Sequence, residues 1–113
     1  MLHVAEVQRS IDFYGKLGFE VGNTFTHQGG TALSWAWLQS GFASLMVARA
    51  SGTVVPEQQA VLFYIYFQDI AETRDKLVSA GLSPGPMEFP FYAPRGVFRL
   101  FDPDGYVLQL MQA

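Results

Sequence analysis

The sequence contains no cysteine, so it has no disulfide, no thiolate metal site and no cysteine nucleophile. Charged residues are scarce at 15%, the net charge is −3, and the seven Lys and Arg residues form no cluster. A nucleic-acid partner is therefore not expected. The longest apolar run, Ala60 to Phe67, has eight residues and is too short to span a bilayer. No basic segment followed by an apolar one opens the chain. We expect a cytoplasmic protein without a membrane partner.

Common catalytic motifs are also missing. The sequence has no Gly-x-Ser-x-Gly turn, no glycine-rich phosphate loop and no His-Glu-x-x-His run. The carboxylates Glu6, Asp12, Glu72 and Asp75 fall where the surfaces of two helices are predicted. They are interpreted as solvated charges and not as a catalytic pair.

Aromatic residues, by contrast, are plentiful: ten Phe, five Tyr and two Trp make up 15% of a chain that is 50% hydrophobic. A length of 113 residues suffices for one domain with a real core, but not for two independent domains. These aromatic side chains have three possible uses: the core, a ligand pocket or a subunit interface.

Hydrophobic spacing in the first half predicts a helix followed by three strands. Val7, Ile11 and Tyr14 recur at helical spacing, and Gly18 is a plausible stop. Strands are predicted from Phe19 onward, over Thr31 to Gln39, and over Phe42 to Val47. Residues 49–59 are polar and contain Gly and Pro, which is typical of a surface linker.

The second half repeats this order after an opening strand, Ala60 to Phe67. Asp69 and Glu72 form a capping-box pattern for a helix whose apolar side is Ile70, Leu77 and Ala80, and Gly81 ends it. The Pro-rich stretch from Ser83 to Pro90 is compatible with only a short, interrupted edge strand. Residues 96–101 and 106–111 are predicted to form a closing hairpin around Asp102-Pro103-Asp104-Gly105, a typical turn sequence.

The two halves match at a nearly constant offset. Val7, Gly18 and Phe19 correspond to Ile70, Gly81 and Leu82, sixty-three positions later. The chain is therefore interpreted as a duplicated unit, with module one at 1–48, a linker at 49–59 and module two at 60–113.

Two motifs carry a family resemblance. Arg9-Ser10-Ile11-Asp12-Phe13-Tyr14-x-x-Leu17-Gly18-Phe19 and Asp102-Pro103-Asp104-Gly105-Tyr106 resemble the vicinal oxygen chelate superfamily of glyoxalases, bleomycin-resistance proteins and dioxygenases. The resemblance implies an α+β fold in which two βαβββ modules form an incomplete eight-stranded barrel around a pocket, usually in a homodimer. Enzymes of this family usually hold a divalent metal with inward His, Gln or Glu side chains from both modules.

The ligand positions that the resemblance implies are largely vacant in this sequence. The first falls before residue 1, the second near Leu45, the third near Leu62, and the fourth at Gln109. Only Gln109 is a usual ligand for a hard cation, and a single neutral amide does not hold a metal. We therefore expect no metal and no cofactor.

Nine residues are candidates for contact with a small-molecule ligand. His3 supplies a polar group at the first strand, and Gln109 one at the last. Trp35 and Trp37 share a strand face, as do Tyr64 and Tyr66, while Phe91, Tyr92 and Arg95 come from a segment that often overhangs the family's pocket. Arg95 suits an anionic ligand. Eight of them have a plainer alternative: solvent exposure for His3 and Arg95, and packing in the core or a dimer interface for the aromatic residues.

Three functions remain open. The preferred hypothesis is a metal-free binding protein that encloses an aromatic or apolar molecule. The alternatives are a metal-dependent lyase or dioxygenase whose missing ligands come from elsewhere, and an interaction module whose aromatic residues form a dimer interface.

Overall fold

The structure is a computed structural model that describes residues 1–113. The chain divides into two compact units, Met1–Val55 and Pro56–Ala113.

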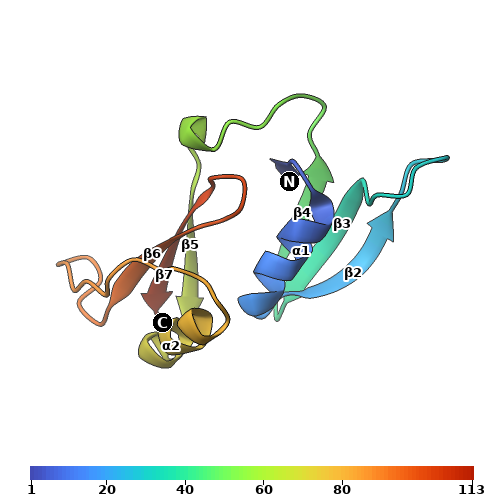
Figure 1. Ribbon diagram of the computed structural model, residues 1–113. Coiled ribbons are helices and arrows are strands. Elements are labelled where there is room, and N and C mark those ends of the chain that lie inside the picture. The colour runs from blue at the N-terminus through green and yellow to red at the C-terminus, as the bar shows by residue number, and fades with distance from the viewer. The chain divides into compact units, whose positions relative to one another are not determined.

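The first unit is one helix on one four-stranded sheet. Its elements are β1 (Leu2–Val4), α1 (Val7–Lys16), β2 (Glu20–Phe25), β3 (Trp35–Ser40) and β4 (Ala43–Arg49). The strand order is β1-β4-β3-β2, with β1 parallel to β4 and the other pairs antiparallel (Figure 1).

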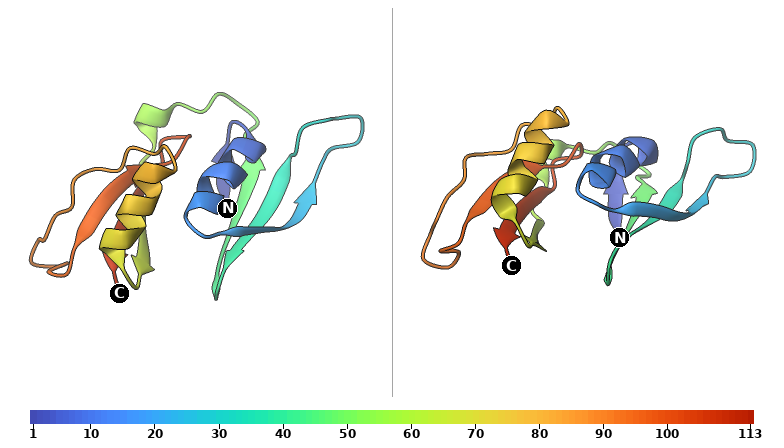
Figure 2. Two further views of the ribbon diagram at one scale, coloured as in Figure 1. Left: turned by 60° about the horizontal axis from the view of Figure 1, so that its bottom comes forward. Right: turned by 90° about the horizontal axis from the view of Figure 1, so that it is seen from below.

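Helix α1 covers one face of this sheet (Figure 2). The covered face presents the fully or nearly buried apolar residues Leu2, Val4, Ala36, Leu38 and Val47, and α1 contributes Val7, Phe13 and Tyr14. Because side chains alternate along a strand, the residues between these positions lie on the opposite face. No helix of the first unit covers that face.

The second unit has a three-stranded sheet and one helix. Its elements are the 3-10 helix η1 (Pro56–Gln58), β5 (Leu62–Phe67), α2 (Ile70–Ser79), β6 (Val97–Phe101) and β7 (Val107–Gln112). The central strand β7 runs parallel to β5 and antiparallel to β6 (Figure 1). The core lies between α2 and the face that carries Phe98, Leu100, Leu108 and Leu110, all at most 3% exposed.

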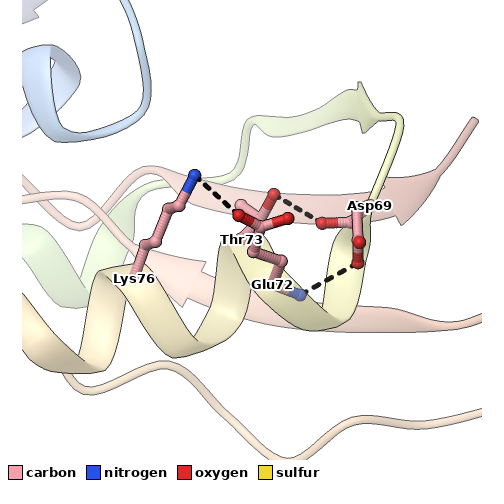
Figure 3. Close-up of polar contacts among 4 residues, drawn as sticks. All are labelled: Asp69, Glu72, Thr73 and Lys76. Carbon is pink, nitrogen blue, oxygen red and sulfur yellow. Dashed lines mark hydrogen bonds and ion pairs between the residues drawn. The ribbon is translucent and has the colours of Figure 1, made fainter.

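Helix α2 begins at a side-chain cap (Figure 3). The Asp69 carboxylate accepts a hydrogen bond from the Glu72 backbone N–H at 3.0 Å, and the Thr73 hydroxyl donates to the Asp69 carbonyl at 2.8 Å. The Glu72 carboxylate does not complete the predicted capping box but forms an ion pair with Lys76 at 3.0 Å. Neither α1 nor α2 is long and apolar enough to cross a membrane.

The turn between β6 and β7 is tightly bonded. Asp102 Oδ1 accepts hydrogen bonds from the backbone N–H groups of Asp104 and Tyr106, each at 2.9 Å. Gly105 has a positive φ of 87°, and a Cβ at this position would lie 2.3 Å from the Pro56 carbonyl oxygen. Since a hairpin turn fixes which residues face each other across the two strands, this turn sets the β6–β7 register.

The α+β class and the predicted order of elements are confirmed. Gly18 and Gly81 follow the two helices with positive φ values of 97° and 89°, as expected for glycine helix stops. The Pro-rich stretch forms only an isolated bridge between Glu88 and Val97, so the second unit has three full strands. The closure of the two sheets into an incomplete barrel remains a prediction.

Two local predictions were wrong. The strand expected from Thr31 begins only at Trp35, because the chain after the Gly29-Gly30 pair bends through residues 31–34 before it joins β2. Ala80, assigned to the apolar side of the second helix, is exposed. It comes directly after the last residue of α2, so it does not belong to the apolar side of the helix.

Candidate functional site

A hollow of about 420 Å³ lies in the second unit, against the sheet face that α2 does not cover. Its volume falls within the usual range for small-molecule sites, roughly 300–1,000 Å³. The residues that line it come from β6, β7 and the preceding loop: Ser83, Gly85, Pro86, Glu88, Tyr92, Val97, Phe98, Arg99, Phe101 and Gln109.

A row of polar residues crosses this sheet face. Gln109 on the central strand is paired with Tyr64 of β5 on one side and with Arg99 of β6 on the other. Paired residues on neighbouring strands point to the same face, and in an antiparallel pair such as Gln109 and Arg99 their Cβ atoms are about 4.5–5.5 Å apart. We call Tyr64, Gln109 and Arg99 the polar row.

Gln109 is the buried member of the polar row. Its side chain is 8% exposed, and it makes no hydrogen bond with another residue of the chain. A primary amide has two N–H donors and an acceptor oxygen. The amide atoms are not among the fully buried polar atoms that lack a partner, so they are accessible from the hollow and can bind water or a ligand there.

Apolar residues flank the polar row on both sides. One neighbouring row is Leu62, Val107 and Phe101, and the other is Tyr66, Met111 and Val97. In the second of these, Val97 and Met111 pack with Ala93 of the loop into a small buried cluster. The hollow therefore combines apolar walls with a narrow polar band, an arrangement typical of small-molecule sites.

Two further hollows, of about 360 and 560 Å³, occur in the first unit. Their polar lining residues, among them Gln39 and Arg49, are exposed or half-buried. Neither contains a buried polar side chain comparable to Gln109.

Residues 1–110 match the model of the Glyoxalase/Bleomycin resistance protein/Dioxygenase superfamily. The chain belongs to this superfamily. No curated protein matches it.

Several solved structures share the superfamily's fold with this chain. A bleomycin-binding protein complexed with bleomycin is 22% identical, with a TM-score of 0.76 over 99% of this chain and 93% of the other. A bleomycin resistance determinant encoded on the transposon Tn5 is 23% identical, with a TM-score of 0.76 over 98% and 92%. TnmS3, an antibiotic-binding protein from Streptomyces sp. CB03234, is 19% identical, with a TM-score of 0.74 over 98% and 89%.

The candidate residues of the second unit fall into three groups. Gln109 and Tyr92 line the hollow. Tyr64 and Tyr66 lie on the same sheet face as Gln109 but outside the lining. Phe91 and Arg95 are exposed on the loop before β6 and do not line the hollow.

Sequence reasoning missed Arg99, Glu88 and Phe101. Arg99 had a usable signal, because it is the only charged residue in the apolar run Val97–Phe101. The Asp102–Gly105 turn then places it opposite Gln109. Glu88 had no such signal, because it reaches the hollow through an isolated bridge to Val97, and such a bridge leaves no periodic pattern in the sequence.

The first unit gathers its candidates on the uncovered face of its own sheet. Trp35 and His3 are both paired with Ala48, so they lie in one row with Ala48 between them. Trp37 is paired with Met46 on the same face. This face also carries Phe25 opposite Trp35, which sequence reasoning did not single out.

The metal position assigned near Leu45 requires a correction of register. Leu45 is paired with the buried Leu38 and so faces the helix side, whereas Ser44 and Met46 lie on the uncovered face. A ligand at position 45 would therefore point toward α1 and not toward the uncovered face. No group of three or more His, Cys, Asp and Glu residues lies together in the structure.

Proposed function

We propose that this chain is a cytoplasmic, metal-free binding protein that holds an aromatic or apolar small molecule in the hollow around Gln109. The observation that carries the proposal is the Gln109 amide, which makes no hydrogen bond within the chain and lines a hollow that combines apolar walls with a band of polar groups. A ligand with a complementary polar group satisfies this amide, and the surrounding apolar surface supplies most of the binding energy.

The chemistry of the walls supports an aromatic or apolar ligand body. Phe101 and Tyr92 are exposed although they line the hollow, so their rings are available for stacking or edge contacts. The bleomycin-binding and antibiotic-binding proteins of the same fold give a precedent for holding a small molecule.

The charge beside Gln109 supports a metal-free site. Arg99, which carries a cationic guanidinium, is paired directly with Gln109 across β6 and β7. A divalent cation bound to the Gln109 oxygen would face this guanidinium at short range, and no carboxylate is paired with Gln109 to compensate the repulsion.

A thermal-shift screen of planar aromatic and anionic compounds tests this function. A ligand present at one hundred times its Kd raises the free energy of unfolding by about 2.7 kcal/mol, and the melting temperature rises with it. We expect at least one compound class to give a saturable increase. A flat response across the panel, or stoichiometric metal by elemental analysis of protein purified without a chelator, would contradict the proposal.

Gln109→Leu separates binding from folding in this screen. Leucine replaces the amide by an apolar group of similar size, so the free protein is expected to be as stable as the wild type or more stable by about 1 kcal/mol. The same variant is expected to lose most of the ligand-induced shift. A variant that is destabilised by several kcal/mol would instead assign Gln109 a structural role.

We also propose that the chain forms a homodimer. Exposed sheet edges and large exposed side chains on the uncovered sheet faces, such as Phe25, Tyr64 and Tyr66, support this assembly. Sedimentation velocity at micromolar concentration is expected to give twice the monomer mass of 12.6 kDa. A monomer at all concentrations would refute the dimer without affecting the binding proposal.

A further inference from the structure

We infer that the ligand of this hollow is an apolar acid, and that Arg99 is the residue that recognises its anionic group. The inference rests on the proposed function and names the class of molecule that the hollow takes. Its starting point is the polar row, in which Arg99 and Gln109 are neighbours on the sheet face that lines the hollow.

The polar row is rich in donors at the end nearest the hollow. Arg99 offers five N–H groups in a planar fork and no acceptor, and the Gln109 amide offers two more. Arg99 and Gln109 are a directly opposed pair on antiparallel strands, so a single planar group can reach both side chains. A carboxylate fits such a site because its two oxygens accept several N–H donors at once.

No group within the chain already satisfies the Arg99 guanidinium. Outside the pairing of β6 with β7, the backbone carbonyl of this residue accepts a hydrogen bond from the Gly85 N–H at 2.8 Å. Its side chain forms no ion pair or hydrogen bond, although Glu88 lines the same hollow. The charge of Arg99 is thus left for solvent or for a ligand.

Glu88 raises the opposite possibility, recognition of a cation. Its backbone bridges Val97, which belongs to the apolar row beside the polar row, so its carboxylate is not opposed to Gln109. The buried amide is therefore adjacent to the positive group and not to the negative one. This geometry favours an anion, and the experiment includes a cationic probe to decide between the two.

Three probes that share one aromatic body test the inference: 2-naphthoate, its neutral amide 2-naphthamide, and the cationic 2-naphthylmethylamine. Dissociation constants are measured by isothermal titration calorimetry for the wild type, Arg99→Gln and Lys16→Gln. Lys16 is an exposed residue at the end of α1 that lines none of the three hollows, so its variant removes the same charge elsewhere. Both replaced side chains are exposed, and stability is expected to change by no more than about 0.5 kcal/mol.

We expect the wild type to bind the carboxylate roughly ten- to a hundredfold more tightly than the amide, the range for one charge-assisted contact. Arg99→Gln is expected to abolish this preference, and Lys16→Gln to retain it. Equal affinity for acid and amide, a preference that survives in Arg99→Gln, or tighter binding of the amine would each overturn the inference while leaving the binding function intact. Failure of all three probes to bind the wild type, together with a flat thermal-shift panel, would instead refute the proposed function and the inference with it.

Discussion

Gly105→Ala is expected to lower the free energy of unfolding by about 4 kcal/mol, a large share of the roughly 5–15 kcal/mol that a domain of this size has. Two effects add. The positive φ of 87° is strained for any residue with a side chain, and the new methyl group would lie 2.3 Å from the Pro56 carbonyl oxygen. Because that neighbour is backbone, relief requires a shift of the segment before β5. Chemical denaturation followed by circular dichroism measures the change.

Gly41→Ala is the matched control. Gly41 also has a positive φ, 59°, but nothing lies within 4 Å of the position of its added Cβ. The backbone strain alone is expected to cost about 1 kcal/mol. Equal losses for the two variants would mean that the contact between the β6–β7 turn and Pro56 does not restrain the fold.

Phe98→Ala is expected to destabilise the second unit by about 4 kcal/mol, within the usual range for removing a buried phenylalanine. Phe98 is 1% exposed and is paired with Leu110, which is completely buried. Loss of the ring leaves a cavity in the core beneath α2. The midpoint of urea denaturation should fall without a change in its slope, since the surface exposed on unfolding stays nearly the same.

Phe101→Ala tests the opposite face of the same strand. Phe101 is 60% exposed and lines the hollow, so its removal is expected to change stability by no more than about 0.5 kcal/mol. The affinity for an aromatic probe should fall, because the ring forms part of the apolar wall. If Phe101→Ala unfolds the protein as readily as Phe98→Ala, the assignment of the two faces of β6 is wrong.

The fold was largely predictable because its signals are local. Turn residues such as Gly18 and Gly81, the alternation in β5, and the cap at Asp69 each depend on a few neighbours in the sequence. The errors arose where the chain depends on distant partners. The start of β3 is decided by the bend after the loop glycines, and the phase of β4 is decided by its pairing with β3.

The candidate site was predictable only in part, for the same reason. Gln109 could be found because a lone amide among leucines is conspicuous in the sequence. Arg99 became important only when the β6–β7 register placed it opposite Gln109. Arg95, chosen as the anion-binding candidate, belongs to a loop whose course has no periodic signal, and it lies outside the lining of the hollow.

Adjacent residues of β7 face opposite sides of the sheet and therefore have different roles. Leu108 and Leu110 hold the core, while Gln109 between them faces the hollow, so a change of specificity need not disturb the scaffold. Under the proposed binding function, diversification of the positions on the uncovered face is a direct route to new ligand preferences, because the core residues stay unchanged.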